Sequence, residues 1–468
     1  MMDLTRLAGL ELEDRPVGVV GLGIEGVDLA RFLCRRSAEV TISDAKNAAQ
    51  LAERISEVGD LPVSLSLSSD QSRDLSDAEL VFVSQGVPLE LPALIALRER
   101  GVPLLSMTGL FLELCPGPIA GITGSSGKTT TTALVSAMFE ADERPFFMGG
   151  NIGVGLLDRL SDIRPYTWSV LEMSHTQLQL VGRSPHVAAI LNITPNHLDR
   201  FGWNEYKNLK TNIIRYQTPQ DVAVLGWDDP ECRAAEALVR GSLQRFSMSS
   251  DMPGDGVFVR SGLAVWRQGR RAEPLFALKD VKLRGRHNQL NAVGAAAIAL
   301  ACGITPEAIA CAVETFHGVP HRLEFVAEAG GVSYYNDSIA TTPERTLAGI
   351  RSFDEPVVLL LGGRDKHLPM EELVREASQR CRKVVIFGES ADKVAAAFRQ
   401  GGGTVPMVRV ETLDEAMESA REAALPGDVV LLSPACTSYD AYENFERRGE
   451  HFRALAQKML KEVAPSLR

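Results

Sequence analysis

The sequence lacks the features that direct a chain into or across a membrane. It has no run of about 18 uncharged apolar residues, so no transmembrane helix is predicted. Residues 1–16 contain no apolar stretch of signal-peptide length. The 7 cysteines are scattered singly without a CxxC pair, which indicates neither a zinc site nor a disulfide framework. We therefore expect a cytoplasmic protein with reduced thiols and no membrane partner.

Positive charge is also scarce. Lysine and arginine number 49 against 60 aspartate and glutamate residues, which leaves a net charge of −11. Non-specific binding to nucleic acid or anionic lipid needs a positive field, so this balance disfavours both partners. A local pocket can still be positive, and an anionic small-molecule substrate is therefore not excluded.

The sequence does contain a repeated alternation of short apolar runs and helical stretches. Hydrophobic residues make up 45% of the 468 residues, and domains usually hold about 100–200 residues, so several cores are expected. Strands are predicted at 17–20, 39–44, 78–84, 102–106, 118–123, 167–172, 187–192, 221–225, 256–266 (as a hairpin), 332–336, 356–361, 383–387 and 428–433. The predicted fold class is α/β with three domains in series: a Rossmann-like domain (1–114), a central P-loop ATPase-like domain (115–317) and a C-terminal Rossmann-like domain (318–468).

A glycine-rich loop, Thr123-Gly-Ser-Ser-Gly-Lys-Thr-Thr130, lies between a predicted strand and a helix predicted over 130–140. Its small residues let backbone N–H groups face phosphate oxygens, and the helix N-terminus adds its positive end. Lys128 is expected to neutralise the β- and γ-phosphates of ATP, and Thr129 to bind Mg²⁺. Ile122 stands where the standard P-loop has glycine, and the alternative is a turn that binds nothing. The expected ATP contacts are Gly124, Ser125, Ser126, Gly127, Lys128, Thr129 and Thr130.

The first domain carries a second glycine pattern, Gly21-x-Gly23-x-x-Gly26, with Asp44 at the end of the next predicted strand. Taken alone, this dinucleotide fingerprint suggests NAD and a dehydrogenase fused to a phosphate-binding module. That interpretation requires hydride transfer, for which the first domain offers no catalytic His/Asp arrangement.

Further motifs occur in a fixed order along the chain. Together with the TGxxGKTT loop they resemble the motifs of the Mur ligase family, and they cover essentially the whole sequence. Ordered matches of this kind are far more specific than any one of them. The motifs are 150–153 (GNIG), 172–177 (EMSHTQ), 192–200 (NITPNHLDR), 285–291 (GRHNQLN), 320–324 (PHRLE), 336–338 (NDS) and 432–436 (LSPAC).

The resemblance implies an ATP-dependent ligase that forms an amide bond. Because a carboxylate oxygen is a poor leaving group, the family first makes an acyl phosphate, from which the amine of an amino acid displaces phosphate. The member indicated adds glutamate, expected to be D-glutamate, to UDP-N-acetylmuramoyl-L-alanine in peptidoglycan precursor synthesis, and acts as a monomer. The alternatives are L-glutamate as acceptor, a folylpolyglutamate synthetase-like ligase, which the first domain disfavours, and an inactive paralogue.

The resemblance also implies roles for individual residues in catalysis. The catalytic set is Lys128, His197 and Lys210. The family carries a carbamylated lysine, for which Lys210 is the candidate. Lys207 is the alternative candidate, because the stretch between His197 and Lys210 is shorter than in the family pattern. Two Mg²⁺ ions would be held by Thr129, Glu172, His197 and Lys210 as its carbamate.

Binding residues follow from the same motifs. A structural salt bridge between Arg322 and Asp337 is the alternative to nucleotide binding by this pair. The further ATP contacts are Asn288, Asn291, Arg322 and Asp337. The UDP-sugar contacts are Gly23, Ile24, Glu25, Asp44, Ser84, Gly86 and Asn151. The glutamate contacts are Thr341, Lys366, Ser438 and Phe445.

The chain departs from the family pattern at two positions. Ile339 stands where the pattern NDSKATN has a lysine, which removes a positive charge near a dianionic substrate. Arg345 or Arg364 could compensate for this loss, or the acceptor could be L-glutamate. Asn196 replaces the usual aspartate before His197, which removes a carboxylate from the metal region.

Overall fold

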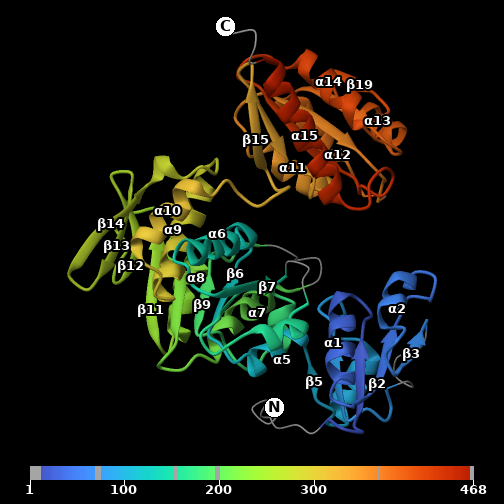
Figure 1. Ribbon diagram of the computed structural model, residues 1–468, viewed down its shortest axis with the longest axis vertical. Coiled ribbons are helices and arrows are strands. Elements are labelled where there is room, and N and C mark those ends of the chain that lie inside the picture. Colours follow the sequence, from blue (N-terminus) through green and yellow to red (C-terminus); the bar gives the residue numbers. More distant parts are fainter. Residues whose placement is uncertain (1–11, 69–74, 152–154, 196–200, 367, 464–468) are drawn as a thin grey trace. The chain divides into compact units, whose positions relative to one another are not determined.

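The computed structural model describes residues 12–68, 75–151, 155–195, 201–366 and 368–463, without the side chains of 461–463. The chain divides into two compact units, whose helices and strands are labelled in Figure 1. Unit 1 comprises Met1–Lys282 and Arg286–Phe316, and unit 2 comprises Leu283–Gly285 and His317–Arg468. Helices alternate with mostly parallel strands, which confirms the predicted α/β class. Within the described residues, no helix has both the length and the apolar character needed to cross a membrane.

The first sheet of unit 1 has five strands in the order β3-β2-β1-β4-β5, all paired in parallel. The strands β1 and β4 are buried along almost their whole length, as expected for apolar runs covered on both faces. The strand order reverses beside β1, which is where open α/β sheets bind ligands. The elements are β1 (Pro16–Val20), β2 (Glu39–Asp44), β3 (Val63–Leu67), β4 (Leu80–Val83), β5 (Leu104–Leu105), α1 (Ile24–Cys34), α2 (Ala52–Val58), α4 (Pro92–Glu99) and α5 (Met107–Leu114).

The second sheet of unit 1 has nine strands in the order β14-β13-β12-β11-β10-β9-β6-β8-β7. Its strands are β6 (Ile119–Thr123), β7 (Phe146–Gly150), β8 (Trp168–Glu172), β9 (Val187–Ile190), β10 (Val222–Gly226), β11 (Ser242–Ser247), β12 (Gly256–Arg260), β13 (Leu263–Gln268) and β14 (Arg271–Ala277). The last three are antiparallel and include the hairpin predicted within 256–266.

Helices of unit 1 flank this second sheet. Two of them, α6 and the alanine-rich α9, pack in one hydrophobic core with the strands, and α9 is buried from Asn291 to Ala299. The helices are α6 (Lys128–Ala141), α7 (Trp203–Arg215), α8 (Pro230–Ala235), α9 (Arg286–Ala301) and α10 (Pro306–Thr315), with short 3-10 turns η2 (Leu157–Asp162), η3 (Gln177–Leu180), η4 (Glu236–Leu238) and η5 (Leu278–Asp280).

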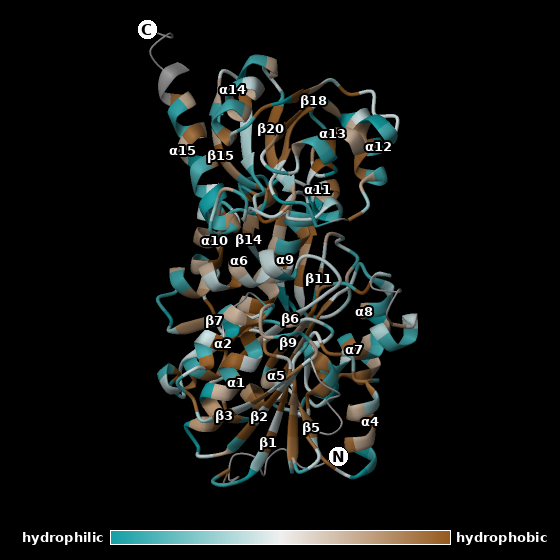
Figure 2. Cartoon of the chain, turned by 90° about the vertical axis from the view of Figure 1, so that its right-hand side faces the viewer, coloured by the Kyte–Doolittle hydropathy of each residue, from teal (hydrophilic) through white to brown (hydrophobic). Residues whose placement is uncertain are grey.

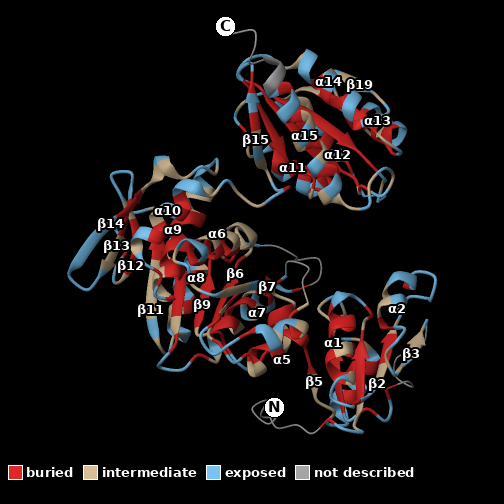
Figure 3. Ribbon diagram, viewed as in Figure 1, coloured by how far each residue is buried: buried red, intermediate tan, exposed pale blue. Residues whose placement is uncertain are grey.

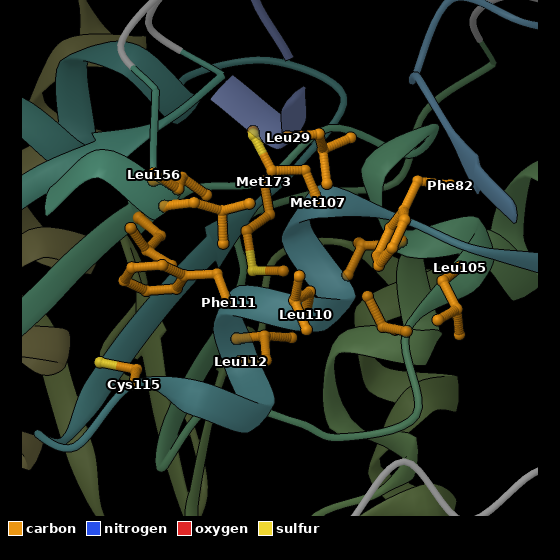
Figure 4. Packing of buried hydrophobic residues seen from close by; sticks show 14 of the residues in the cluster. Leu29, Phe82, Leu105, Met107, Leu110, Phe111, Leu112, Cys115, Leu156 and Met173 are labelled. Carbon is orange, nitrogen blue, oxygen red and sulfur yellow. The ribbon is translucent and has the colours of Figure 1, made fainter. Parts of the chain in front are cut away.

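Helix α5 connects the two sheets of unit 1 through a shared hydrophobic core. Met107, Leu110 and Phe111 of α5 lie in one cluster with Leu29 of α1 and with Met173, which follows β8 (Figure 4). Burying such side chains stabilises a fold by roughly 1.5–3 kcal/mol each. The core therefore fixes the carboxyl end of β8 relative to the first sheet.

Unit 2 is built on one six-stranded sheet in the order β15-β16-β20-β17-β18-β19, of which only the β15–β16 pairing is antiparallel. Separate hydrophobic clusters cover its two faces. The central strands are therefore buried (red in Figure 3), and their residues are mostly hydrophobic (brown in Figure 2). The elements are β15 (Glu324–Ala329), β16 (Val332–Asn336), β17 (Val357–Gly362), β18 (Cys381–Phe387), β19 (Met407–Arg409), β20 (Val429–Ala435), α11 (Pro343–Ile350), α12 (Glu371–Arg380), α13 (Ala391–Gln400), α14 (Leu413–Ala423) and α15 (Phe445–Val463).

Candidate active site

The phosphate loop joins β6 to α6 in a conformation that requires glycine at its end. Gly127, the N-cap of α6, has a φ of +82°, in the left-handed region. A Cβ atom there would lie 2.3 Å from Oδ1 of Asn291 on α9. Asn291 in turn donates from Nδ2 to Oδ1 of Asn288 (3.1 Å). The loop and the start of the 14-residue α6 thus have the geometry expected of an anion site, and both asparagines lie beside it.

Two lysines converge on one carbonyl of this loop. Lys128 donates from Nζ to the carbonyl of Gly124 (2.9 Å), and Lys210 of α7 donates from Nζ to the same oxygen (2.8 Å). Lys210 is only 1% exposed. Burial, reinforced by the charge of Lys128, lowers the pKa of Lys210 to about 7. A large fraction of Lys210 is therefore uncharged at neutral pH, and an uncharged amine is the form that reacts with CO₂.

The competing lysine of α7 has a different environment. Lys207 forms a salt bridge with Glu231 (3.2 Å), and both side chains are partly exposed. It does not donate to the phosphate loop in the described structure. Of the two lysines, it is Lys210 that lies at the loop.

An acidic side chain is buried at the carboxyl end of β8. Glu172 is 2% exposed, and its Oε1 accepts a hydrogen bond from Nδ2 of Asn151 (2.9 Å). Its Oε2 has no hydrogen-bond partner among the described residues. An unpartnered buried carboxylate oxygen is costly unless a cation binds it. A carboxylate oxygen is a ligand that Mg²⁺ prefers, so Glu172 could hold one such ion, although no group of three or more His, Cys, Asp or Glu side chains gathers for a metal among the described residues.

Side chains for which no role was predicted hold the loop from the segment after β9 and from α7. Asn192 accepts the Ser126 N–H at Oδ1 (2.9 Å) and donates from Nδ2 to the Ser126 carbonyl (3.2 Å). The Ser125 hydroxyl lies 3.1 Å from the hydroxyl of Tyr206 and donates to the carbonyl of Thr194 (3.0 Å). The available signal for Asn192 was its position in the motif 192–200, whereas Tyr206 lies in none of the motifs.

Of the other residues predicted for this site, the structure describes the two threonines of the loop but not His197. Thr129 and Thr130 are half-buried in the first turn of α6, next to Lys128. His197 and Asn196 lie outside the described residues.

The predicted UDP-sugar residues gather at the carboxyl ends of β1, β2 and β4. Asp44 accepts the Leu22 N–H at Oδ2 (2.8 Å), and the Ser84 hydroxyl donates to the carbonyl of Gly21 (3.0 Å). These bonds fix the glycine turn at the point where the strand order reverses. Three further predicted contacts are exposed around this turn: Gly23, Ile24 and Gly86.

The carboxylates and amides near this turn also link the two sheets of unit 1. Glu25 is buried, which raises its pKa, and its Oε2 accepts the N–H of Gln85 (2.8 Å). Gln177, after β8, is also hydrogen-bonded to Glu25. Asn151, predicted with the UDP-sugar group, contacts Glu172 instead of the turn.

The predicted nucleotide pair of unit 2 does not form the salt bridge considered as its alternative. Asp337 accepts the Leu323 N–H at Oδ1 (3.2 Å) and the Ser433 hydroxyl at Oδ2 (2.8 Å). Burial raises the pKa of Asp337 to about 7, although these hydrogen bonds and the nearby charge of Arg322 oppose the shift. No salt bridge joins Asp337 to Arg322 in the described structure.

The predicted glutamate contacts follow the carboxyl ends of β16, β17 and β20. Lys366 donates from Nζ to the hydroxyl of Thr341 (3.3 Å). Ser438 is buried, and Phe445, the first residue of α15, accepts a hydrogen bond at its carbonyl from the Ser338 hydroxyl (2.8 Å). Three of the predicted residues thus lie in loops that follow the carboxyl ends of these strands, and Phe445 begins the helix after the last of them.

One buried cation that the sequence left without a role ties these loops together. Arg448 of α15 is 0% exposed and donates to the carbonyls of Ser338 (3.0 Å), Gly362 (3.2 Å) and Cys436 (3.2 Å). No described carboxylate forms a salt bridge with it. Its neighbour Arg447 is exposed, and two adjacent arginines do not indicate by sequence alone which one is buried.

Comparison with known proteins agrees with this geometry. Family models match the chain as a MurD-like N-terminal domain of Mur ligases (15–106), a Mur ligase middle domain (122–299) and a Mur ligase glutamate ligase domain (321–436). The chain is therefore three α/β domains in series, whereas the boundaries 1–114, 115–317 and 318–468 stay a prediction.

Relatives of known function extend over nearly the whole chain. A UDP-N-acetylmuramoylalanine–D-glutamate ligase from Symbiobacterium thermophilum is 41% identical over 97% of this chain and 100% of its own length. A ligase of the same name from Acidobacterium capsulatum is 40% identical over 95% and 97%. The crystal structure of UDP-N-acetylmuramate-alanine ligase MurC from Thermotoga maritima has a TM-score of 0.52 at 18% identity, covering 95% of this chain and 99% of that one, and is similar in fold.

Proposed function

The chain belongs to the Mur ligase family, and we propose from this that it joins D-glutamate to UDP-N-acetylmuramoyl-L-alanine with conversion of ATP to ADP and phosphate. Mur ligases are ATP-dependent enzymes that form amide bonds. The reaction is a step of peptidoglycan precursor synthesis, and relatives that extend over most of the chain are named for it.

The observation that carries this proposal is the convergence of Lys128 and Lys210 on the Gly124 carbonyl. In the first step a substrate carboxylate oxygen attacks the γ-phosphorus and the bond to ADP breaks, which gives an acyl phosphate. In the second step the glutamate amine attacks the acyl carbon, loses a proton, and phosphate leaves. Both steps bring negative charges together, and a cation such as Lys128, fixed beside the phosphate loop, lowers that barrier.

Magnesium fits the acidic part of the site. We propose that Thr129 and Glu172 bind one ion, and that His197 and the carbamate of Lys210 bind a second. The ions would neutralise charge on the phosphates. The unpartnered Glu172 Oε2 and the depressed pKa of Lys210 support these assignments.

The remaining substrate contacts are proposals supported by position. The UDP-sugar would occupy the switch point of the first sheet, with the turn at Gly23–Glu25, Asp44, Ser84 and Gly86. Asn151 would act next to Glu172. The adenine nucleotide would also contact Asn288, Asn291, Arg322 and Asp337, and glutamate would contact Thr341, Lys366, Ser438 and Phe445.

We also propose a cytoplasmic location and a monomeric enzyme. All seven cysteines are free thiols, as is usual in a reducing compartment where ATP is present. Every residue proposed for the reaction comes from a single chain. A folylpolyglutamate synthetase-like activity is disfavoured, because residues 15–106 match an N-terminal domain characteristic of MurD-like ligases.

The test is release of phosphate from ATP and Mg²⁺ with UDP-N-acetylmuramoyl-L-alanine and a panel of D- and L-amino acids. We expect turnover with D-glutamate and none with L-glutamate. Lys128→Met, which removes the cation of the phosphate loop, should reduce turnover at least about 100-fold. Turnover with L-glutamate alone would make the acceptor wrong, and absence of ADP with either enantiomer would refute the reaction.

A further inference from the structure

Two cations of unit 2 meet at one short turn after β16. Arg345, in the first turn of α11, donates from Nη1 to the carbonyl of Ile339 (3.2 Å). Lys366, in the loop after β17, donates from Nζ to the hydroxyl of Thr341 (3.3 Å). The N–H of Thr341 donates to the same Ile339 carbonyl (2.9 Å), so the turn brings the two positive groups to the same place.

These cations lack a negative partner in the described structure. Neither Arg345 nor Lys366 forms a salt bridge with a described carboxylate. Asp337 is close enough to feel the charge of Arg345, but both of its oxygens accept hydrogen bonds, from Leu323 and Ser433. Burial and then the charge of Arg345 lower the pKa of Lys366, as expected for like charges held together. A bound anion would relieve this repulsion.

The neighbouring arginine is already neutralised. Arg364 is exposed and forms a salt bridge with Glu389 (3.1 Å). Its backbone pairs with Thr437 in both directions, so its main chain is fixed while its side chain points to Glu389. Of the two arginines that could replace a lysine at position 339, Arg345 is the one whose guanidinium touches residue 339 itself.

We propose that Arg345 and Lys366 form a two-cation subsite for a carboxylate of the incoming glutamate, and that Arg345 supplies the charge that Ile339 does not. The inference rests on the proposed function and adds a specificity-determining residue to it. A planar guanidinium can bind both oxygens of a carboxylate, and an ammonium beside it adds a compact charge. Both residues lie within the matched glutamate ligase domain.

The test uses the full chain and four variants. Arg345→Gln removes the charge but keeps a donor for the Ile339 carbonyl, and Arg364→Gln is the matched control. Arg345→Lys keeps a charge, and Ile339→Lys in the Arg345→Gln background restores one from a different position. Initial rates of phosphate release give KM separately for glutamate, ATP and the UDP-sugar substrate. Thermal unfolding of each variant shows whether it is folded.

We expect Arg345→Gln to raise KM for glutamate about 10- to 100-fold, the range for a lost charged hydrogen bond, with kcat and KM for ATP changed far less. Arg364→Gln should behave like the wild type, and both lysine variants should recover most of the loss. A rise in KM for ATP alone would overturn the inference and assign the pair to a phosphate. Unchanged kinetics in a folded Arg345→Gln protein would make Arg345 a turn-capping residue only. If the wild type shows no glutamate-dependent turnover, the proposed function itself is refuted, together with the subsite that rests on it.

Discussion

At the scale of single residues, burial and not sequence spacing distinguishes the two lysines of α7. Lys207 and Lys210 lie one turn apart, and the resemblance to the family favours Lys210 without excluding its neighbour. The structure separates them because α7 turns one face to the core and the other to solvent. Lys210 reaches the Gly124 carbonyl from the buried face, whereas Lys207 pairs with Glu231. The role of Lys210 as a carbamate stays a prediction.

That prediction can be tested by chemical rescue. Lys210→Ala should lose at least about 99% of the activity, because it removes a charged group from the phosphate site. Short carboxylates such as formate or acetate should restore part of it by occupying the place of the carbamate. The assay is phosphate release, with Lys207→Ala as the matched control that should stay active. Full activity of Lys210→Ala, or a loss that no carboxylate restores, would contradict the assignment.

The buried Asp337 should make unit 2 less stable as the pH rises. Burial raises its pKa to about 7 in the folded state, against about 3.9 in an unfolded chain. The folded state therefore binds the proton more tightly, and the free energy of unfolding falls between about pH 4 and pH 7 by on the order of 3 kcal/mol. Asp337→Asn keeps an acceptor oxygen and should remove this fall.

Thermal unfolding of the nucleotide-free protein from pH 5 to pH 8 measures the effect. The midpoint of Asp337→Asn should rise relative to the wild type across this range. Asp392→Asn, at an exposed carboxylate of α13, is the control and should follow the wild-type profile. Parallel profiles for all three proteins would mean that Asp337 is ionised throughout.

At the scale of helices and strands, the sequence predicted the central strands well and most edge strands poorly. The strands β2 and β16 were predicted at their observed bounds. Five strands without a sequence prediction, β3, β7, β14, β15 and β19, lie at sheet edges, where one side of the strand has no partner. Edge strands are less buried, so their sequences mix polar and apolar residues or, as in β14, contain proline. The interior β11 was also missed, because its sequence SLQRFS alternates polar and apolar residues too weakly.

The positions of the carboxyl ends of β16, β17 and β20 depend on a side-chain contact that the apolar pattern of the strands does not predict. Arg448 donates to a carbonyl near each of these ends, and its side chain is wholly buried. Arg448→Met should destabilise unit 2 by about 3 kcal/mol or more, because buried carbonyls lose a charged donor. It should also raise KM for glutamate, since the loops that carry Ser438 and Lys366 begin at these ends.

Urea denaturation and initial-rate kinetics measure the two effects. Arg447→Met is the matched control, because Arg447 is the adjacent residue, is exposed, and its guanidinium pairs with Glu450 (2.9 Å). It should change the free energy of unfolding by less than about 1 kcal/mol. Equal behaviour of the two methionine variants would show that the buried guanidinium does not hold the loops.

At the scale of the whole molecule, the order of the motifs predicted three α/β domains, but the packing of those domains depends on long-range contacts. The first two sheets share one core through α5, so contacts group them in a single compact unit. The apolar residues of α5 predict that this helix is buried, but they do not predict which sheet or helix it packs against. Unit 2, in contrast, has two hydrophobic clusters made only of its own residues.

Unit 2 should therefore fold without the rest of the chain. A fragment of residues 317–468 omits only Leu283–Gly285 from the unit. The losses include the exposed ion pair between Arg284 and Glu355 and the contact of Arg284 with the ring of Tyr335, and exposed contacts of either kind contribute at most about 1 kcal/mol. We expect the fragment to unfold cooperatively on heating, with native near-UV circular dichroism. A fragment of 283–468 should be slightly more stable, and calorimetry of the full chain should contain a transition near the same temperature. A fragment that binds hydrophobic dye and melts without a transition would mean that unit 2 depends on unit 1, in spite of its separate core.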